Sequence, residues 1–194
     1  MKTLGLTGGI GMGKSVAARF FRERGTQIVD TDELARQLVE PGQPALAEIE
    51  AVFGKSMVAP GGRLRRDELA QLVFTDPAAR KKLEAILHPR IRERWLAQVK
   101  VWRTENHPLA VVVIPLLFET QAESAFDKII CVACSAAAQR ERLLARGWTP
   151  AQIEQRLAAQ WPIDQKIARA DFVIWTDGSL ESHAGQIERI IARF

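Results

Sequence analysis

The chain has 194 residues, of which 47% are hydrophobic and 26% are charged, and its formal net charge is +4. This composition is typical of a folded globular protein and excludes a disordered one, and the longest apolar runs are too short to span a bilayer. The basic excess favours an anionic ligand, but the basic runs with interleaved aromatic residues that are typical of nucleic-acid binding are missing, so a nucleotide-sized ligand accounts for it equally well.

The first predicted elements are a strand at Leu4–Thr7 and a helix at Val16–Arg24, which flank the glycine-rich segment Gly8–Ser15. The segment reads G-G-I-G-M-G-K-S and fits the phosphate-loop pattern G-x-x-x-x-G-K-[ST]. Its glycines allow a tight turn that aims several N–H groups at phosphate oxygens. Lys14 supplies charge for the terminal phosphates, and Ser15 offers an oxygen to Mg²⁺. The segment therefore predicts a binding site for a nucleoside triphosphate.

A second predicted strand, Thr26–Val29, is followed by two carboxylates, Asp30 and Asp32, and by a short helix at Glu33–Val39. The carboxylates lie at the strand's carboxyl end, the edge at which open α/β sheets bind ligands. Each could accept the proton of an attacking hydroxyl or reach Mg²⁺, and each could instead cap the following helix. We favour Asp32 for the catalytic role.

A helix at Ala45–Phe53 and a loop or tight hairpin at Gly54–Arg63 precede a long helical pattern from Arg65 to about Arg103. Within this pattern, Asp76-Pro77 predicts the start of a helix. His88-Pro89 predicts a break, because the residue before a proline avoids the helical region. We expect this helical block to form a second lobe inserted between two strands.

The second half of the chain alternates strands with helices. Strands are predicted at Leu109–Ile114, Lys128–Ala133 and Asp171–Trp175, and helices at Ala136–Arg146, from Thr149-Pro150 to about Gln160, and at Ser179–Arg193. This alternation predicts an α/β protein with a parallel sheet in three layers. The strand beginning at Leu109 ends in proline without the aspartate of switch ATPases, and no N-K-x-D element for guanine is present, so a molecular switch is disfavoured.

Two cysteines, Cys131 and Cys134, have a spacing that could indicate a zinc or redox site. However, residues three apart on a strand point to opposite faces, and no second pair completes a tetrahedral site. We therefore expect two buried thiols. A single lysine precedes the first strand, so we also expect no signal peptide and a cytoplasmic protein.

Several arginines lie on the predicted helices that follow the fourth strand. Arg142 and Arg146 share one helix face, with Arg140 on the same helix and Arg156 on the next. These side chains could neutralise charge on a transferred phosphoryl group and exclude water, or they could belong to an ordinary solvated surface. Their spacing leaves both interpretations open.

Short motifs follow one another along almost the whole chain. They are T-G-G-I-G-M-G-K-S at 7–15, V-D-T-D at 29–32, A-R-Q at 35–37, E-P-G at 40–42, L-H-P at 87–89, P-L-L-F-E at 115–119, E-R-L at 141–143 with Arg146, A-A-Q at 158–160 and A-D-F-V-I at 170–174. In this combination and order, the chain resembles the dephospho-CoA kinases. The resemblance implies a transferase that uses ATP and Mg²⁺ to phosphorylate the 3′-hydroxyl of dephospho-CoA, the last step of coenzyme A biosynthesis.

The resemblance also implies roles for individual residues. The residues expected to take part in catalysis are Asp32, Lys14, Arg142 and Arg146. Those expected to bind ATP are Gly9, Gly11, Met12, Gly13, Lys14, Ser15 and Val16, and those expected to bind the metal ion are Ser15 and Asp32. Those expected to bind the substrate are Asp32, Arg36, His88, Pro115, Leu116 and Glu119. The implied fold is that of the P-loop kinases, with a five-stranded parallel core (1–53, 106–135 and 166–194), a helical substrate lobe (54–105) and a helical lid (136–165). We expect a monomer or small homo-oligomer with a small-molecule substrate and no nucleic-acid or membrane partner.

Two positions depart from the family pattern. Val16 stands where a threonine usually follows the loop serine, and Trp175-Thr176-Asp177 stands where an Asp-Asn pair is common near the expected adenine pocket. The alternatives are a P-loop kinase of another nucleoside or nucleotide, a nucleotide-gated binding protein and, least favoured, a nucleic-acid module. A panel of acceptors, nucleotide-dependent partner binding and salt-dependent DNA binding would distinguish them.

Overall fold

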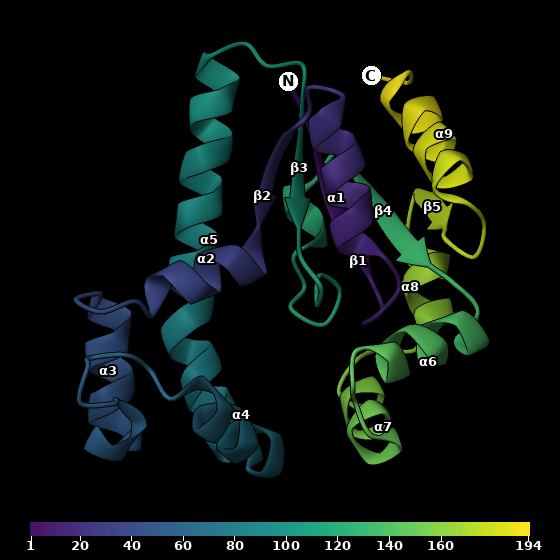
Figure 1. The fold of residues 1–194 in the computed structure, drawn as a ribbon. Coiled ribbons are helices and arrows are strands. Elements are labelled where there is room, and N and C mark those ends of the chain that lie inside the picture. The colour runs from purple at the N-terminus through teal and green to yellow at the C-terminus, as the bar shows by residue number, and fades with distance from the viewer. The chain divides into compact units, whose positions relative to one another are not determined.

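The computed structural model describes residues 1–194, which divide into two units, residues 1–30 with 99–194 and residues 31–98. A five-stranded parallel sheet lies at the centre of the first unit, with the strand order β2-β3-β1-β4-β5 (Figure 1). Its strands are β1 (Lys2–Gly8), β2 (Gln27–Asp30), β3 (Leu109–Val113), β4 (Lys128–Ala133) and β5 (Phe172–Trp175). The predicted parallel α/β sheet is confirmed.

The central strands are buried on both faces, as a parallel sheet covered by helices requires. All five residues of β3 are buried, which explains its unbroken apolar sequence. The register places Asp30 beside Val113 and Val113 beside Leu6. The carboxyl end of β2 and the loop that follows β1 therefore emerge at the same edge of the sheet.

Helices cover the two faces of the sheet. On one face, α1 (Lys14–Glu23) and α9 (Leu180–Ile191) pack against alternate strand residues that include Leu6 and Val132. On the other face, α8 (Ile163–Arg169) packs on β1 and β4, and its apolar side chains contact Ala133 and Cys134. Because Val132 and Ala133 are neighbours on one strand, they point to opposite faces, and the predicted three layers follow.

Two further helices of the first unit lie within the predicted lid. Ser135 caps α6 (Ala136–Ala145) by accepting a hydrogen bond from Ala138 N, and Thr149 forms a capping box with Gln152 at the start of α7 (Pro150–Ala158). The action of this segment as a lid remains a prediction. A short 3₁₀ helix, η2 (Glu123–Ala125), precedes β4. The sequence did not predict α8, which has only seven residues.

The second unit is helical and has its own apolar core. It comprises α2 (Thr31–Leu38), α3 (Pro44–Phe53), η1 (Lys55–Met57), α4 (Arg66–Thr75) and most of α5 (Pro77–Thr104). Buried side chains such as Ile49, Leu69 and Ile86 form the core. The segment predicted as a loop or hairpin closes through an antiparallel bridge between Val58 and Leu64. The unit spans residues 31–98 and the predicted substrate lobe residues 54–105, and the role of this lobe remains a prediction.

The predicted helix break at His88-Pro89 is wrong, because α5 continues through Pro89. Proline removes one helical hydrogen bond and costs about 3 kcal/mol. Burial of Ile86 and packing of Leu87 and Ile91 against the same core favour an uninterrupted helix. Arg90 Nη1 also donates to Ile86 O at 2.6 Å, which adds a hydrogen bond in the turn that contains the proline.

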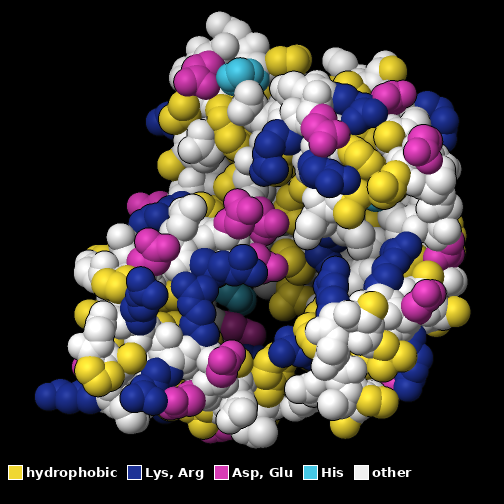
Figure 2. All heavy atoms as spheres, in the orientation of Figure 1, with side chains coloured by type: hydrophobic (Ala, Val, Ile, Leu, Met, Phe, Trp, Pro, Cys, Tyr) yellow, Lys and Arg dark blue, Asp and Glu magenta, His cyan; other side chains and the backbone are white.

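On the face seen in Figure 2, Lys and Arg side chains are interspersed with Asp and Glu side chains rather than separated from them. None of the helices combines the length and the apolar character that crossing a membrane would require.

Candidate functional site

The segment predicted as a phosphate loop joins β1 to α1 as a tight turn. Gly8 has φ 147° and Gly13 has φ 97°, a region that residues with a Cβ rarely adopt. A Cβ on Gly8 would lie 2.2 Å from the carbonyl oxygen of Val132 on the neighbouring strand. The spacing of these glycines therefore follows from the path of the backbone.

The loop presents donors without internal partners. Neither Gly11 N nor Gly13 N donates a hydrogen bond within the chain. The first-turn N–H groups of α1, such as those of Ser15 and Val16, lack helical acceptors and lie at the positive end of the helix dipole. Lys14 Nζ donates to the carbonyls of Gly8 and Gly9 at 2.9 Å each, which keeps its charge beside the loop. Such an arrangement can bind phosphate oxygens.

Two glutamines hold the peptide groups of Ile10 in this loop. Gln139 Nε2, on α6, donates to Ile10 O at 2.7 Å, and Ile10 N donates to Gln160 Oε1, just after α7, at 3.1 Å. Sequence analysis assigned neither glutamine a role. The A-A-Q motif contains Gln160, but nothing in the sequence pairs it with a residue that far away.

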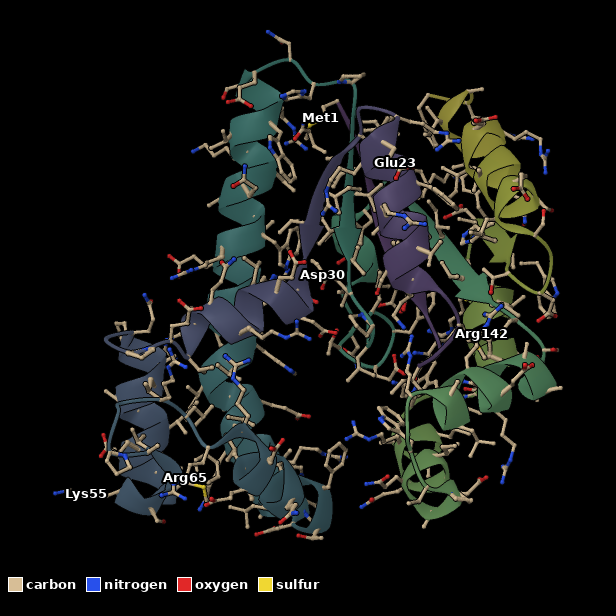
Figure 3. The ribbon with its side chains drawn as sticks, viewed as in Figure 1. Met1, Glu23, Asp30, Lys55, Arg65 and Arg142 are labelled. Carbon is tan, nitrogen blue, oxygen red and sulfur yellow. The ribbon has the colours of Figure 1, made fainter.

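The two arginines predicted to act together have different surroundings. Arg142 is half-buried and donates through Nη1 to Thr176 Oγ1 at 2.9 Å and through Nη2 to Thr176 O (Figure 3). Arg146 caps the carboxyl end of α6, is exposed and has no hydrogen-bond or ion-pair partner in the chain. Of the two, Arg146 is the one whose guanidinium is available to an anion.

The segment that departs from the family pattern anchors two parts of the site. Thr176 Oγ1 donates to Met12 O at 3.0 Å. Asp177 accepts hydrogen bonds from Ser135 N at 3.0 Å and Ser135 Oγ at 3.1 Å, directly before α6. The sequence identified these positions only as departures. Their side-chain oxygens were the one signal that they make polar contacts.

The two candidate carboxylates belong to different units, Asp30 to the first and Asp32 to the second. Asp30 is the last residue of β2 and is partly buried (Figure 3). Asp32 is exposed in the first turn of α2, where an acidic side chain also interacts favourably with the helix dipole. The exposure of Asp32 is compatible with contact to a substrate, and its role as a base remains a prediction.

Among the residues predicted to bind substrate after β3, Glu119 forms a buried ion pair and Pro115 accepts hydrogen bonds through its carbonyl. Lys166 is fully buried, and its Nζ lies 2.7 Å from Glu119 Oε1 and donates to Pro115 O at 3.0 Å. Thr7 Oγ1 donates to the same carbonyl at 3.1 Å. Leu116 is partly buried. The contacts of Pro115 and Glu119 thus connect β1, the end of β3 and α8, and sequence analysis missed Lys166.

The remaining candidates lie in the second unit. Arg36 is exposed on α2 and borders a cavity of about 230 Å³ lined mainly by aliphatic side chains such as Val39 and Leu69. Arg66 also lines it, and its Nη2 donates to Arg36 O at 3.2 Å. His88 is exposed on α5 and does not line the cavity. This cavity could take an apolar chain with an anionic group beside the arginines.

Cys131 and Cys134 are buried free thiols, as expected, and burial raises the pKa of Cys131 to about 11. No group of three or more His, Cys, Asp or Glu side chains could hold a metal ion. Mg²⁺ at kinase sites is typically bound by one or two protein groups together with substrate phosphates, which Ser15 would fit.

Comparison with known proteins gives consistent matches. A family model described as dephospho-CoA kinase matches residues 2–182. A dephospho-CoA kinase of Anaeromyxobacter dehalogenans is 46% identical over 193 residues, covering 99% of this chain and 92% of the relative. The crystal structure of TT1252 from Thermus thermophilus has a TM-score of 0.86 and 34% identity, covering 100% of this chain and 97% of the other. Dephospho-CoA kinase from Campylobacter jejuni has a TM-score of 0.73 and 24% identity, covering 98% and 96%.

Proposed function

The chain belongs to the dephospho-CoA kinase family, and we propose that it transfers the γ-phosphate of ATP to the 3′-hydroxyl of dephospho-CoA, giving coenzyme A and ADP. The observation that carries this proposal is the family match over residues 2–182. The fold is that of the P-loop kinases, and the phosphate loop stands between β1 and α1 as such a reaction needs.

We propose that the loop from Gly9 to Val16 binds the ATP phosphates. Lys14 Nζ would then exchange its carbonyl acceptors for β- and γ-phosphate oxygens, and the unpaired N–H groups of Gly11 and Gly13 would donate to the same chain of phosphates. The Ser15 hydroxyl, with Asp32 directly or through water, would hold Mg²⁺, which supplies neutralisation of charge on the β- and γ-oxygens.

We propose Asp32 as the base. Its carboxylate takes the proton of the 3′-hydroxyl as that oxygen bonds to the γ-phosphorus and the bond between this phosphorus and the ADP oxygen breaks. Arg146, and Arg142 if its bonds to Thr176 open, would stabilise the charge on the transferred group. The exposure of Asp32 and Arg146 supports these roles.

For the acceptor, we propose contacts with Arg36 and His88 of the second unit and with Pro115, Leu116 and Glu119 of the first. The exposed side chains of Arg36 and His88 support contact with a polar part of dephospho-CoA. We further propose that the protein works in the cytoplasm, because the reaction consumes ATP and both cysteines are free thiols.

The deciding experiment incubates the protein with Mg-ATP and dephospho-CoA and looks for the 3′-phosphorylated product by mass spectrometry. Other nucleosides and nucleotides serve as a matched panel of acceptors, and ADP release is followed in parallel. Folded protein that binds ATP but forms no coenzyme A rejects the proposal. Turnover of a different acceptor indicates another P-loop kinase, and slow hydrolysis without any phosphorylated acceptor indicates a nucleotide-gated binding protein.

A further inference from the structure

Two alternate carbonyls of the phosphate loop are held by side chains from distant parts of the first unit. The Ile10 carbonyl accepts from Gln139 Nε2 at 2.7 Å, and the Met12 carbonyl accepts from Thr176 Oγ1 at 3.0 Å. Both donor residues are only 6% exposed. Buried side chains held by their surroundings therefore fix the direction in which each carbonyl points.

Each of these carbonyls shares a rigid plane with an N–H group of the loop. In a trans peptide, C=O and N–H point in opposite directions. Holding the Ile10 carbonyl therefore turns the N–H of Gly11 away from Gln139, and holding the Met12 carbonyl turns the N–H of Gly13 away from Thr176. Glycine restricts its own backbone least of all residues, so an external contact is needed to keep these planes in one orientation.

The hydrogen bonds around Thr176 determine where its single hydroxyl proton goes. Arg142 Nη1 donates to Thr176 Oγ1, and Arg142 Nη2 donates to Thr176 O. A guanidinium has no acceptor, so the hydroxyl cannot donate to it, and its proton is directed to Met12 O. Arg142 thus acts on the loop through Thr176.

The two other N–H groups between Ile10 and Gly13 are already paired, and that of Met12 donates to Gly9 O at 3.3 Å. Ile10 N donates to Gln160 Oε1 at 3.1 Å, whereas Gly11 N and Gly13 N have no acceptor in the chain. Within residues 10–13, the unpaired donors are therefore the two whose peptide planes Gln139 and Thr176 hold.

We propose that Gln139 and Thr176 are positioning residues, which orient the N–H groups of Gly11 and Gly13 toward the polyphosphate of a nucleotide. Arg142 supports this arrangement by holding Thr176. The inference rests on the proposed function only in taking a nucleoside triphosphate as ligand, and it does not depend on the acceptor.

The test compares substitutions that differ in one donor. Thr176→Val keeps the shape of the side chain and removes the hydroxyl, and Thr176→Ser restores it. Thr3→Val is the matched control, because Thr3 is equally buried in β1 and its hydroxyl has no partner. Gln139→Met removes the second donor at similar volume. Affinities for ATP and for inorganic tripolyphosphate are measured by calorimetry without acceptor, and folding is followed by thermal unfolding.

Loss of one oriented donor to a charged ligand should weaken binding of both ATP and tripolyphosphate by about 10- to 100-fold in Thr176→Val and in Gln139→Met. Thr176→Ser and Thr3→Val should bind both ligands like the unmodified protein. With dephospho-CoA, the KM for ATP should rise while the KM for the acceptor stays unchanged. A merely structural role would instead lower the melting temperature and leave the affinity of the folded protein unaltered.

Folded Thr176→Val that binds tripolyphosphate with unaltered affinity overturns the proposal, as does equal weakening in Thr176→Ser. If Thr176→Val does not fold, Gln139→Met decides the outcome by the same measurement. The calorimetric titrations contain no phosphoryl acceptor. If dephospho-CoA is not the substrate, these affinities are therefore unaffected, and the error is recognised separately in the product assay.

Discussion

The buried ion pair between Lys166 and Glu119 allows a quantitative test of how the end of β3 is held. The side chain of Lys166 is 0% exposed and that of Glu119 is 14% exposed, with Nζ and Oε1 2.7 Å apart. Lys166→Met would leave the carboxylate with one hydrogen bond, from Trp161 N at 2.9 Å, while its Oε2 is already buried without a partner. The substitution therefore strands a negative charge inside the protein.

Removing one partner of a buried pair costs about 3–5 kcal/mol, since the remaining charge has lost its compensation. We expect Lys166→Met to lower the free energy of unfolding by that amount, and Glu119→Leu to lower it by a similar amount. The double variant removes both charges and should lie within about 1 kcal/mol of the unmodified protein, because an apolar pair of similar volume is often neutral. The coupling energy should then reach at least about 5 kcal/mol.

Urea unfolding followed by tryptophan fluorescence provides the measurement. Trp161 reports on this region, because it stacks on Phe118 with ring centroids 6.3 Å apart. Arg140 and Glu154 supply a control, because their 2.9 Å ion pair has side chains 50% and 64% exposed. Arg140→Met should cost less than about 1 kcal/mol. Single variants at the buried pair that also cost this little, or whose effects simply add in the double variant, would refute the reasoning.

Three further outcomes are expected. Lys14→Ala should lower phosphoryl transfer by at least about 10³-fold with an unaltered unfolding transition, because its charge serves the phosphates and not the core; retained turnover would contradict this. Asp32→Asn should lower kcat by about 10²- to 10⁴-fold while ATP affinity stays constant, and Asp30→Asn should have the smaller effect; an unaltered rate in Asp32→Asn would place the base elsewhere. Burial lowers the pKa of His183 from 6.5, and the charge of Arg142 lowers it further. As the pH falls, this histidine is therefore protonated in the unfolded chain before it is protonated in the folded protein. The free energy of unfolding consequently decreases as the pH falls below about 6.5. His183→Leu should flatten this dependence between pH 7.5 and 5.5, and an identical slope in the variant would exclude His183 as its source.

The parts of the fold that local sequence determines were predicted well. The phosphate loop and β3 were recognised because a glycine spacing and a short continuous apolar run each suffice to indicate their structure. The helix α8 was missed because its seven residues are too few for an apolar period. The break expected at Pro89 did not occur, since packing of the surrounding turns against the core of the second unit outweighs the lost hydrogen bond.

The candidate site was predicted only as far as its residues are close in sequence. Lys14 and Ser15 could be predicted as site residues because they belong to one continuous motif. The contact of Gln139 with Ile10 spans 129 positions, and that of Thr176 with Met12 spans 164. No local pattern encodes such pairs, so the sequence could not show that the guanidinium of Arg142 donates to Thr176. The role of Arg142 at the nucleotide remains a prediction.

These distant contacts compensate for the conformational freedom that the loop requires. Glycines at 8, 11 and 13 permit positive φ values of 147°, 74° and 97°, but the same freedom would let the intervening peptide planes rotate. A binding loop that must be ordered by its ligand loses affinity through the entropy of that ordering. Where buried side chains fix the peptide planes during folding, the entropy cost of ordering the loop is not incurred again when phosphate binds. The glycine motif therefore makes the turn possible, and Gln139 and Thr176 make it a preorganised set of donors.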